Sequence, residues 1–184
     1  MVATLHSLVA PPKMRRTSSE APLRLAYLFR AFAVAIPVSV LGVVVLSPVD
    51  ELARALGVPS PTEPGLLMRM ALTGLALAPV LATSLSLEAL RRCALAVHDG
   101  QGLTLELARH LRAAGTWMLV SSAGALFVPT LAGLVLSAAS GKVTLMVHVG
   151  TGVVLPIILA GALRLLGGVV VSAAAMAEDH SRIV

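Results

Sequence analysis

Charge is what this sequence has least of. Only 12% of its 184 residues are Asp, Glu, Lys or Arg, whereas a soluble domain carries about 25%. Hydrophobic residues make up 57% of the chain, and the mean hydropathy is +0.92. So few charged side chains cannot cover the surface of a folded protein of this length in water. The composition therefore predicts an integral membrane protein.

Cysteine and aromatic residues are also scarce. Cys93 is the single cysteine, which excludes an internal disulfide and a multi-cysteine zinc or iron–sulfur site. Aromatic residues make up 3% of the chain, and no basic run is longer than "KMRR" at 13–16, so we expect no direct binding of nucleic acid. No nucleophile elbow, Walker loop, HExxH motif or dinucleotide fingerprint is present. We therefore predict no enzymatic activity, no catalytic residues, no metal and no cofactor.

Four long apolar stretches are separated by polar connections. Each can form a helix that crosses a hydrocarbon core of about 30 Å, and none shows the alternation that membrane strands require. We predict an all-α membrane protein with four transmembrane helices, arranged as a four-helix bundle and embedded in a lipid bilayer. The predicted spans are about 28–46, 66–87, 113–137 and 149–172.

The first 26 residues form a mixed tail rich in proline, serine and basic residues, which we predict to be disordered and cytoplasmic. A short amphipathic helix near residues 23–30 would lead into the transmembrane domain, which we place at 27–184. A cleaved signal peptide is a rival interpretation of residues 1–47. The region before the apolar run is long for a signal peptide, so we favour a retained first span.

The distribution of Lys and Arg predicts the orientation. Outside the fourth span, ten of them fall in residues 1–30, in the segment 88–112 and at the C-terminus. The three on the other side are Arg54, Arg69 and Lys142. Positive charge marks the cytoplasmic side of a membrane. We therefore expect a multi-pass protein of the bacterial inner membrane with both termini and the segment 88–112 in the cytoplasm.

The stretch "HDGQGLTLELARHLRAAG" at 98–115 carries the signals of a helical hairpin. Gly100 and Gly102 can end one helix, and Thr104 is a good N-cap for the next. We predict that the second span continues for about three turns beyond the membrane and reverses here, giving a cytoplasmic hairpin at 88–112. Its basic residues are either a solvated surface or a site for a soluble partner: Arg91, Arg92, Arg109 and Arg112.

The fourth apolar stretch, 143–177, is too long for one crossing. As a single helix it would measure about 50 Å at 1.5 Å per residue. We expect its apolar excess to pack against the hairpin. Arg164 is its one arginine, and it either contacts a ligand within the membrane or extends to the inner headgroups. The ligand hypothesis places Arg164 in a pocket formed near Pro79, Pro129 and Pro156.

Two further patterns bear on packing and on metal binding. Stripes of small residues run along spans two, three and four, with Gly74, Ser121 and Gly161 among their members. They predict close helix packing, within one chain or across a homo-oligomer. Histidines and carboxylates are expected to gather on the cytoplasmic face, with no recognised ligand spacing. They are His98, Asp99, Glu106, His110, Glu178, Asp179 and His180.

The hairpin and the C-terminus together resemble a bacterial family of small four-helix membrane proteins, domain of unknown function 2975. The resemblance covers about residues 25–184. Leu103 stands where that family has an aromatic residue, and Leu107 or Ala108 where it has Asn. The matching residues are Gly102, Thr104, Leu111, Arg112, Gly115, Glu178, Asp179 and Val184. The family's genes often lie beside a small helix-turn-helix regulator, so the resemblance implies a membrane partner for a transcription factor.

We therefore expect a non-enzymatic membrane sensor or anchor for a cytoplasmic regulatory protein such as a helix-turn-helix regulator. The alternative is a small transport or lipid-handling protein that uses Arg164 in an intramembrane pocket.

Overall fold

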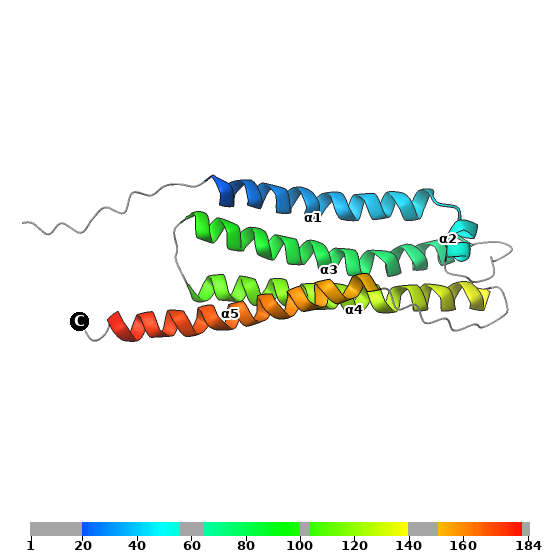
Figure 1. Cartoon of the computed structure of the whole chain (residues 1–184). Coiled ribbons are helices and arrows are strands. Elements are labelled where there is room, and N and C mark those ends of the chain that lie inside the picture. Colours follow the sequence, from blue (N-terminus) through cyan, green and yellow to red (C-terminus); the bar gives the residue numbers. More distant parts are fainter. Residues whose placement is uncertain (1–19, 56–64, 100–103, 140–150, 182–184) are drawn as a thin grey trace, which may run out of the picture.

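All regular elements that the computed structural model describes are helices (Figure 1). The described residues are 20–55, 65–99, 104–139 and 151–181. Four helices are long and apolar enough to cross a membrane, as the sequence predicts. In chain order the elements are α1 (Ala21–Leu46), α2 (Val49–Ala55), α3 (Leu66–His98), α4 (Leu105–Ala139), the 3₁₀ turn η1 (Thr151–Val153) and α5 (Val154–Ser181).

The bounds of α1 and α5 differ from the predicted spans. α1 begins at Ala21, so the short leading helix and the first span are one continuous helix, and the predicted domain boundary at 26/27 lies inside it. Pro22 lies in the first turn of α1. Backbone N–H groups have no acceptor within the helix there, so proline removes no hydrogen bond. α5 begins at Val154 and continues to Ser181, beyond the predicted end of the fourth span.

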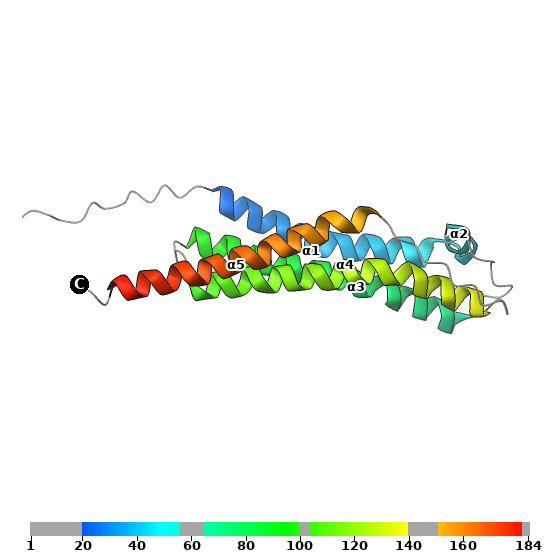
Figure 2. The ribbon, with the colours of Figure 1, turned by 60° about the horizontal axis from the view of Figure 1, so that its bottom comes forward.

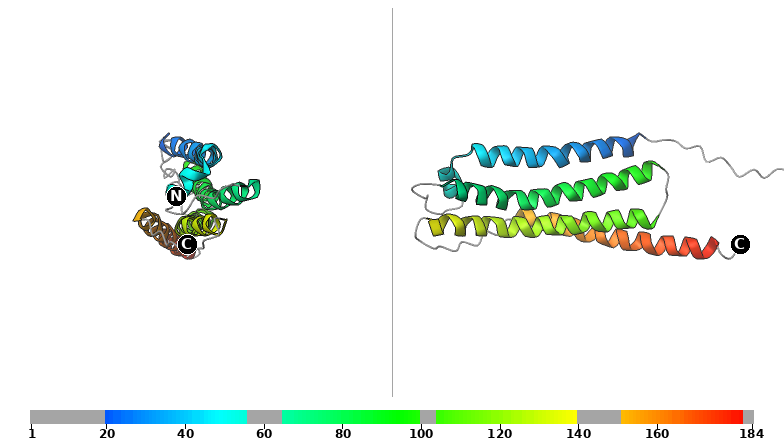
Figure 3. Two further views of the ribbon diagram at one scale, coloured as in Figure 1. Left: turned by 90° about the vertical axis from the view of Figure 1, so that its right-hand side faces the viewer. Right: turned by 180° about the vertical axis from the view of Figure 1, so that it is seen from behind.

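The four long helices form an open row in chain order. Extensive contacts join α1 to α3, α3 to α4 and α4 to α5, and the end-on view places α1 and α5 at opposite edges (Figure 3). Among the described residues no extensive contact joins α1 to α4 or to α5, so the expected bundle is not closed. Lipid tails are as apolar as leucine, so a membrane does not drive the helices to close around a core.

α2 covers the end of the row that lies far from the hairpin. Val49 and Ala53 on α2 are buried against Leu72 of α3 and against Leu136 of α4. Pro48 precedes this short helix, and Ser47 before it is extended, with φ −72° and ψ 135°, as expected of a residue before proline. The acidic Asp50 and Glu51 lie in the first turn of α2, where the helix dipole favours negative charge.

Specific contacts fix the relative levels of α3, α4 and α5. The Ser86 hydroxyl on α3 donates to the Ala114 carbonyl on α4 at 2.9 Å. Next to Ala114, a Cβ built on Gly115 would lie 2.7 Å from Cγ of Arg164 on α5. Arg164 is therefore level with the region of Ser86 and Glu88.

Charged residues on α3 bound an apolar zone. Arg69 and Glu88 are nineteen residues apart with no charged residue between them, which is about 28 Å of helix and close to the thickness of a hydrocarbon core. We call the part of the row between these two levels the apolar zone. Arg164 lies at its edge, and the part of α5 beyond Arg164 lies beside the charged end of the α3–α4 pair and extends past it (Figure 2).

Candidate functional site

The end of the α3–α4 pair is a helical hairpin with a polar groove. The Leu107 N–H donates to Thr104 Oγ1 at 3.3 Å, which is the geometry of an N-cap. Gly100 and Gly102, the other predicted caps, lie outside the described residues. A groove of about 280 Å³ lies between the end of α3 and the start of α4. Its lining residues are Arg92, Leu95, Ala96, Asp99, Glu106 and His110.

The two arginines on α3 share one carboxylate. Arg91 Nη1 lies 2.8 Å and Arg92 Nε lies 3.4 Å from the same oxygen of Glu88. One carboxylate opposite two guanidinium groups leaves a net positive charge on this arm. Because these side chains are partly or largely exposed, each pair stabilises the helix by only a few tenths of a kcal/mol.

The two arginines on α4 lie on a different side of the hairpin. A Cβ built on Gly167 of α5 would lie 2.8 Å from Cγ of Arg112, so the stem of Arg112 packs over that glycine. Arg109 is one turn away on the same side of α4 and is exposed. The candidate partner-binding arginines are therefore two pairs, one beside Glu88 and one beside α5.

Arg164 repeats the geometry of Arg112. Its stem packs over Gly115 of α4, and among the described residues neither arginine forms an ion pair. Each arginine is followed three residues later by the glycine that accommodates the other arginine. Because α4 and α5 run in opposite directions (Figure 1), the two Arg-x-x-Gly segments face each other with the same contacts.

The part of α5 beyond Arg164 exposes an apolar face beside the charged hairpin. Leu165 is 74%, Val169 64% and Met176 66% exposed, and no charged residue occurs between Arg164 and Glu178. We call Leu165, Leu166, Val169 and Met176 the α5 apolar face. The inner side of α5 contributes Val170 to a cluster around the buried Cys93, Ala96 and Leu107, so the apolar excess of the fourth stretch does pack against the hairpin.

A small cavity inside the apolar zone does not include Arg164. It measures about 180 Å³, and Pro156 lines it together with hydroxyl residues of α3 and α4. These hydroxyl groups are already hydrogen-bonded. Thr83 Oγ1 and Ser121 Oγ lie 2.6 Å apart, and the Ser86 and Ser122 hydroxyls donate to backbone carbonyls. Pro79 lies elsewhere, against Gly124 of α4.

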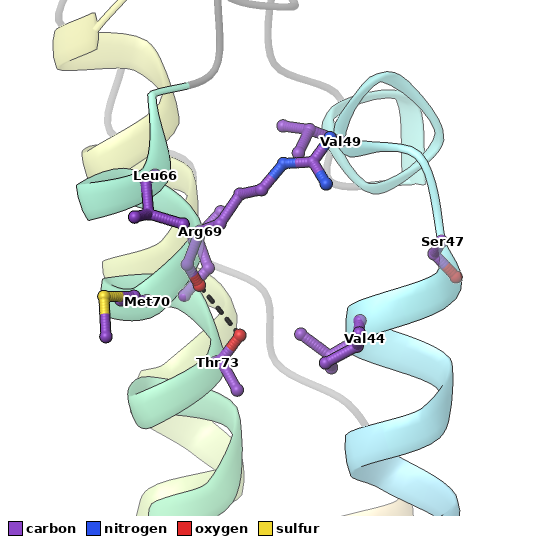
Figure 4. Close-up of a pocket in the computed structure, with 9 residues that line it drawn as sticks. Val44, Ser47, Val49, Leu66, Arg69, Met70 and Thr73 are labelled. Carbon is purple, nitrogen blue, oxygen red and sulfur yellow. Dashed lines mark hydrogen bonds between the residues drawn. The ribbon is translucent and has the colours of Figure 1, made fainter.

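A larger cleft lies at the far end of the apolar zone, between α1, α2 and the start of α3. It measures about 440 Å³ and is lined mainly by aliphatic side chains (Figure 4). Arg69 is the one charged residue among the described residues that line it, and it extends from α3 toward Val49 of α2. No sequence pattern predicted this cleft, because Arg69 was interpreted only as one of the charges that indicate the orientation of the chain. The lining residues are Val44, Val45, Ser47, Val49, Leu66, Arg69, Met70, Leu72 and Thr73.

Metal ligands do not gather in the part of the chain that the structure describes. No group of three or more His, Cys, Asp and Glu residues there could hold a metal ion. His110 Nε2 lies 3.9 Å from Glu106, which is too long for a hydrogen bond. The side chains of Glu178, Asp179 and His180 lie outside the described residues.

These features define a multi-pass membrane protein of four long helices, with a charged hairpin at one end and an apolar cleft at the other. No protein-family model, no curated protein and no solved structure matches the chain. The resemblance to domain of unknown function 2975 therefore stays a prediction.

Proposed function

We propose that this chain is a non-enzymatic protein of the bacterial inner membrane that anchors a soluble cytoplasmic partner, such as a helix-turn-helix regulator, on its hairpin. Both termini and the hairpin lie in the cytoplasm in this proposal, as the excess of Lys and Arg at that end favours. The resemblance to domain of unknown function 2975 supports the same kind of partner.

The α5 apolar face is the observation that carries this proposal. Its residues Val169 and Met176 lie beyond Gly167, at the level of the hairpin, and therefore outside the apolar zone. Lipid tails do not reach that level if the zone lies in the hydrocarbon core. Val169 and Met176 would then face water unless a protein covers them, and exposed apolar residues of this kind mark interaction sites.

The neighbouring charges suit a partner with an acidic rim. Arg112 of α4 packs over Gly167 of α5, and the exposed Arg109 lies one turn away on α4. Neither arginine has an acidic partner among the described residues. An apolar centre bordered by arginines is the usual composition of a protein interface. A second copy of this chain would present the same positive charge and is disfavoured for that reason.

The alternative function places a ligand at Arg164, and the geometry supports it less well. Arg164 packs over Gly115 at the edge of the apolar zone and does not line the cavity at Pro156. An arginine at that level reaches the lipid headgroups without a pocket.

Co-purification tests the anchoring proposal. The full chain in detergent is mixed with a soluble extract of the cells that produce it, and recovery of bound proteins is compared between the original protein and its variants. We expect Val169→Gln and the double change Arg109→Gln with Arg112→Gln to reduce recovery about tenfold each. Glutamine keeps part of the arginine stem, so the packing over Gly167 is largely preserved.

Arg54→Gln provides the matched control because Arg54 is an exposed arginine at the opposite end of the row. Its recovery should equal that of the original chain. Equal recovery from all variants contradicts the proposal.

A further inference from the structure

We infer that the cleft at Arg69 binds one anionic phospholipid, with an acyl chain between α1 and α3 and the lipid phosphate on the Arg69 guanidinium. This inference concerns the opposite end of the molecule from the hairpin and does not depend on the partner proposed there.

The lining of the cleft suits hydrocarbon. Val44 and Val45 of α1 and Leu72 of α3 are among its lining residues. The Thr73 hydroxyl donates to the Arg69 carbonyl at 2.8 Å (Figure 4). That bond leaves no free polar group from Thr73 in the cleft. The volume of about 440 Å³ falls within the range of about 300–1,000 Å³ that is typical of small-molecule sites.

The position of Arg69 suits a phosphate. It lies at the boundary of the apolar zone, about 28 Å of helix from Glu88, which is the depth at which lipid phosphates meet the hydrocarbon core. Asp50 and Glu51 are the nearest acids along α2, and neither forms an ion pair with Arg69. Among the described residues the guanidinium therefore has no carboxylate partner, and its planar pair of donors matches two phosphate oxygens.

The start of α3 adds backbone donors at the same place. Gly65 precedes α3 and provides no side-chain cap, and the first intrahelical bonds are those from Met68 and Arg69 to the Gly65 carbonyl. The N–H groups of Leu66 and Leu67 therefore have no acceptor within the helix. Leu66 lines the cleft, so these donors border the position assigned to the phosphate.

The positive charge of Arg69, which no described carboxylate balances, favours an anionic lipid over a zwitterionic one. Phosphatidylglycerol carries a net negative charge and phosphatidylethanolamine carries none, while both supply acyl chains and a phosphate. One positive charge near the membrane surface favours the anionic lipid by about fivefold.

Fluorescence quenching by brominated lipids tests the inference with the full chain in vesicles. Trp117 is the only tryptophan of the chain and lies on α4, so Trp117→Phe removes the background signal. Val44→Trp then places a reporter in the cleft, because the Val44 side chain points from α1 toward α3 (Figure 4). We expect brominated phosphatidylglycerol to quench this reporter about fivefold more effectively per molecule than brominated phosphatidylethanolamine.

Substitutions at Arg69 assign the preference to this residue. Arg69→Gln should abolish it, and Arg69→Lys should retain part of it because the charge remains while the paired donors are lost. Arg54→Gln is the matched control, since Arg54 lies on α2 at the same end but does not line the cleft.

Three results would overturn the inference. They are equal quenching by the two lipids, a preference that survives Arg69→Gln, and displacement of brominated phosphatidylglycerol by millimolar inorganic phosphate. The last result would mean that Arg69 binds a soluble anion instead of a lipid. Equal melting temperatures of the Arg69 and Arg54 variants establish that each variant is folded.

Discussion

Arg164 packs its side-chain stem over Gly115 of the neighbouring helix, and a Cβ built on that glycine would lie 2.7 Å from the Arg164 Cγ. The same contact occurs one turn away with the helices exchanged, where Arg112 of α4 packs over Gly167 of α5. The two contacts lock the register of α4 against α5. This register keeps Arg164 out of the middle of the apolar zone and places the end of α5 beside the hairpin.

Gly115→Ala should destabilise the protein because the new Cβ would also lie 2.7 Å from the Ala160 carbonyl oxygen. A backbone atom cannot move away without shifting α5, so we expect a loss of roughly 1–3 kcal/mol. Gly161→Ala is the control, since nothing lies within 4 Å of its Cβ position. Alanine forms helix better than glycine by up to about 1 kcal/mol, so this variant should be neutral or more stable. Thermal unfolding in detergent measures both changes, and equal losses would refute the packing argument.

Cys93 should react slowly with maleimides in the folded protein because it is only 8% exposed. Val170 of α5 packs against the cluster that contains Cys93. We expect Val170→Ala to raise the labelling rate roughly fivefold, which corresponds to about 1 kcal/mol for methyl groups removed from a partly buried valine. Val169→Ala is the adjacent control, since Val169 is 64% exposed. If both variants label at the same rate, α5 does not cover Cys93.

The sequence predicted the helices well because apolar length is a local property. The continuation of span two to His98 and the N-cap at Thr104 follow from residues within a few positions of each other, and the structure contains both features. A short helix near residues 23–30 and a span at 28–46 were predicted as two elements, whereas the structure has one helix that begins at Ala21. Arg24 and Arg30 interrupt the apolar run, but a helix continues through arginine at no cost in propensity.

Packing between helices could not be predicted in the same way. The stripes of small residues included Gly161, which lies in open space, whereas the close contacts fall on Gly115, Gly124 and Gly167. Which glycine accepts a neighbour depends on the relative register of two helices, and that register depends on side chains far apart in the sequence. The cleft at Arg69 was missed for the same reason, since α1 and α3 each supply half of its lining.

Thr104→Ala should weaken the hairpin by about 1 kcal/mol because the Leu107 N–H loses its acceptor. Thr116→Ala is the control: the Thr116 hydroxyl donates to the Arg112 carbonyl within the same helix, so no backbone N–H loses an acceptor. Hydrogen exchange of the first turn of α4 measures the difference. We expect faster exchange only in the Thr104 variant, and unchanged exchange in both would exclude a capping role.

The proposed orientation predicts which end of the row is accessible from outside the cell. In a Cys93→Ala background, single cysteines are placed at two exposed acidic positions, Glu51→Cys on α2 and Asp99→Cys at the end of α3. A membrane-impermeant maleimide should label the α2 position in intact cells, because α2 lies at the end with few basic residues. The α3 position should be labelled only after the membrane is permeabilised, since the arginine-rich end stays in the cytoplasm. The reverse pattern would invert the topology, and it would place the hairpin and the α5 apolar face where no cytoplasmic regulator can reach them.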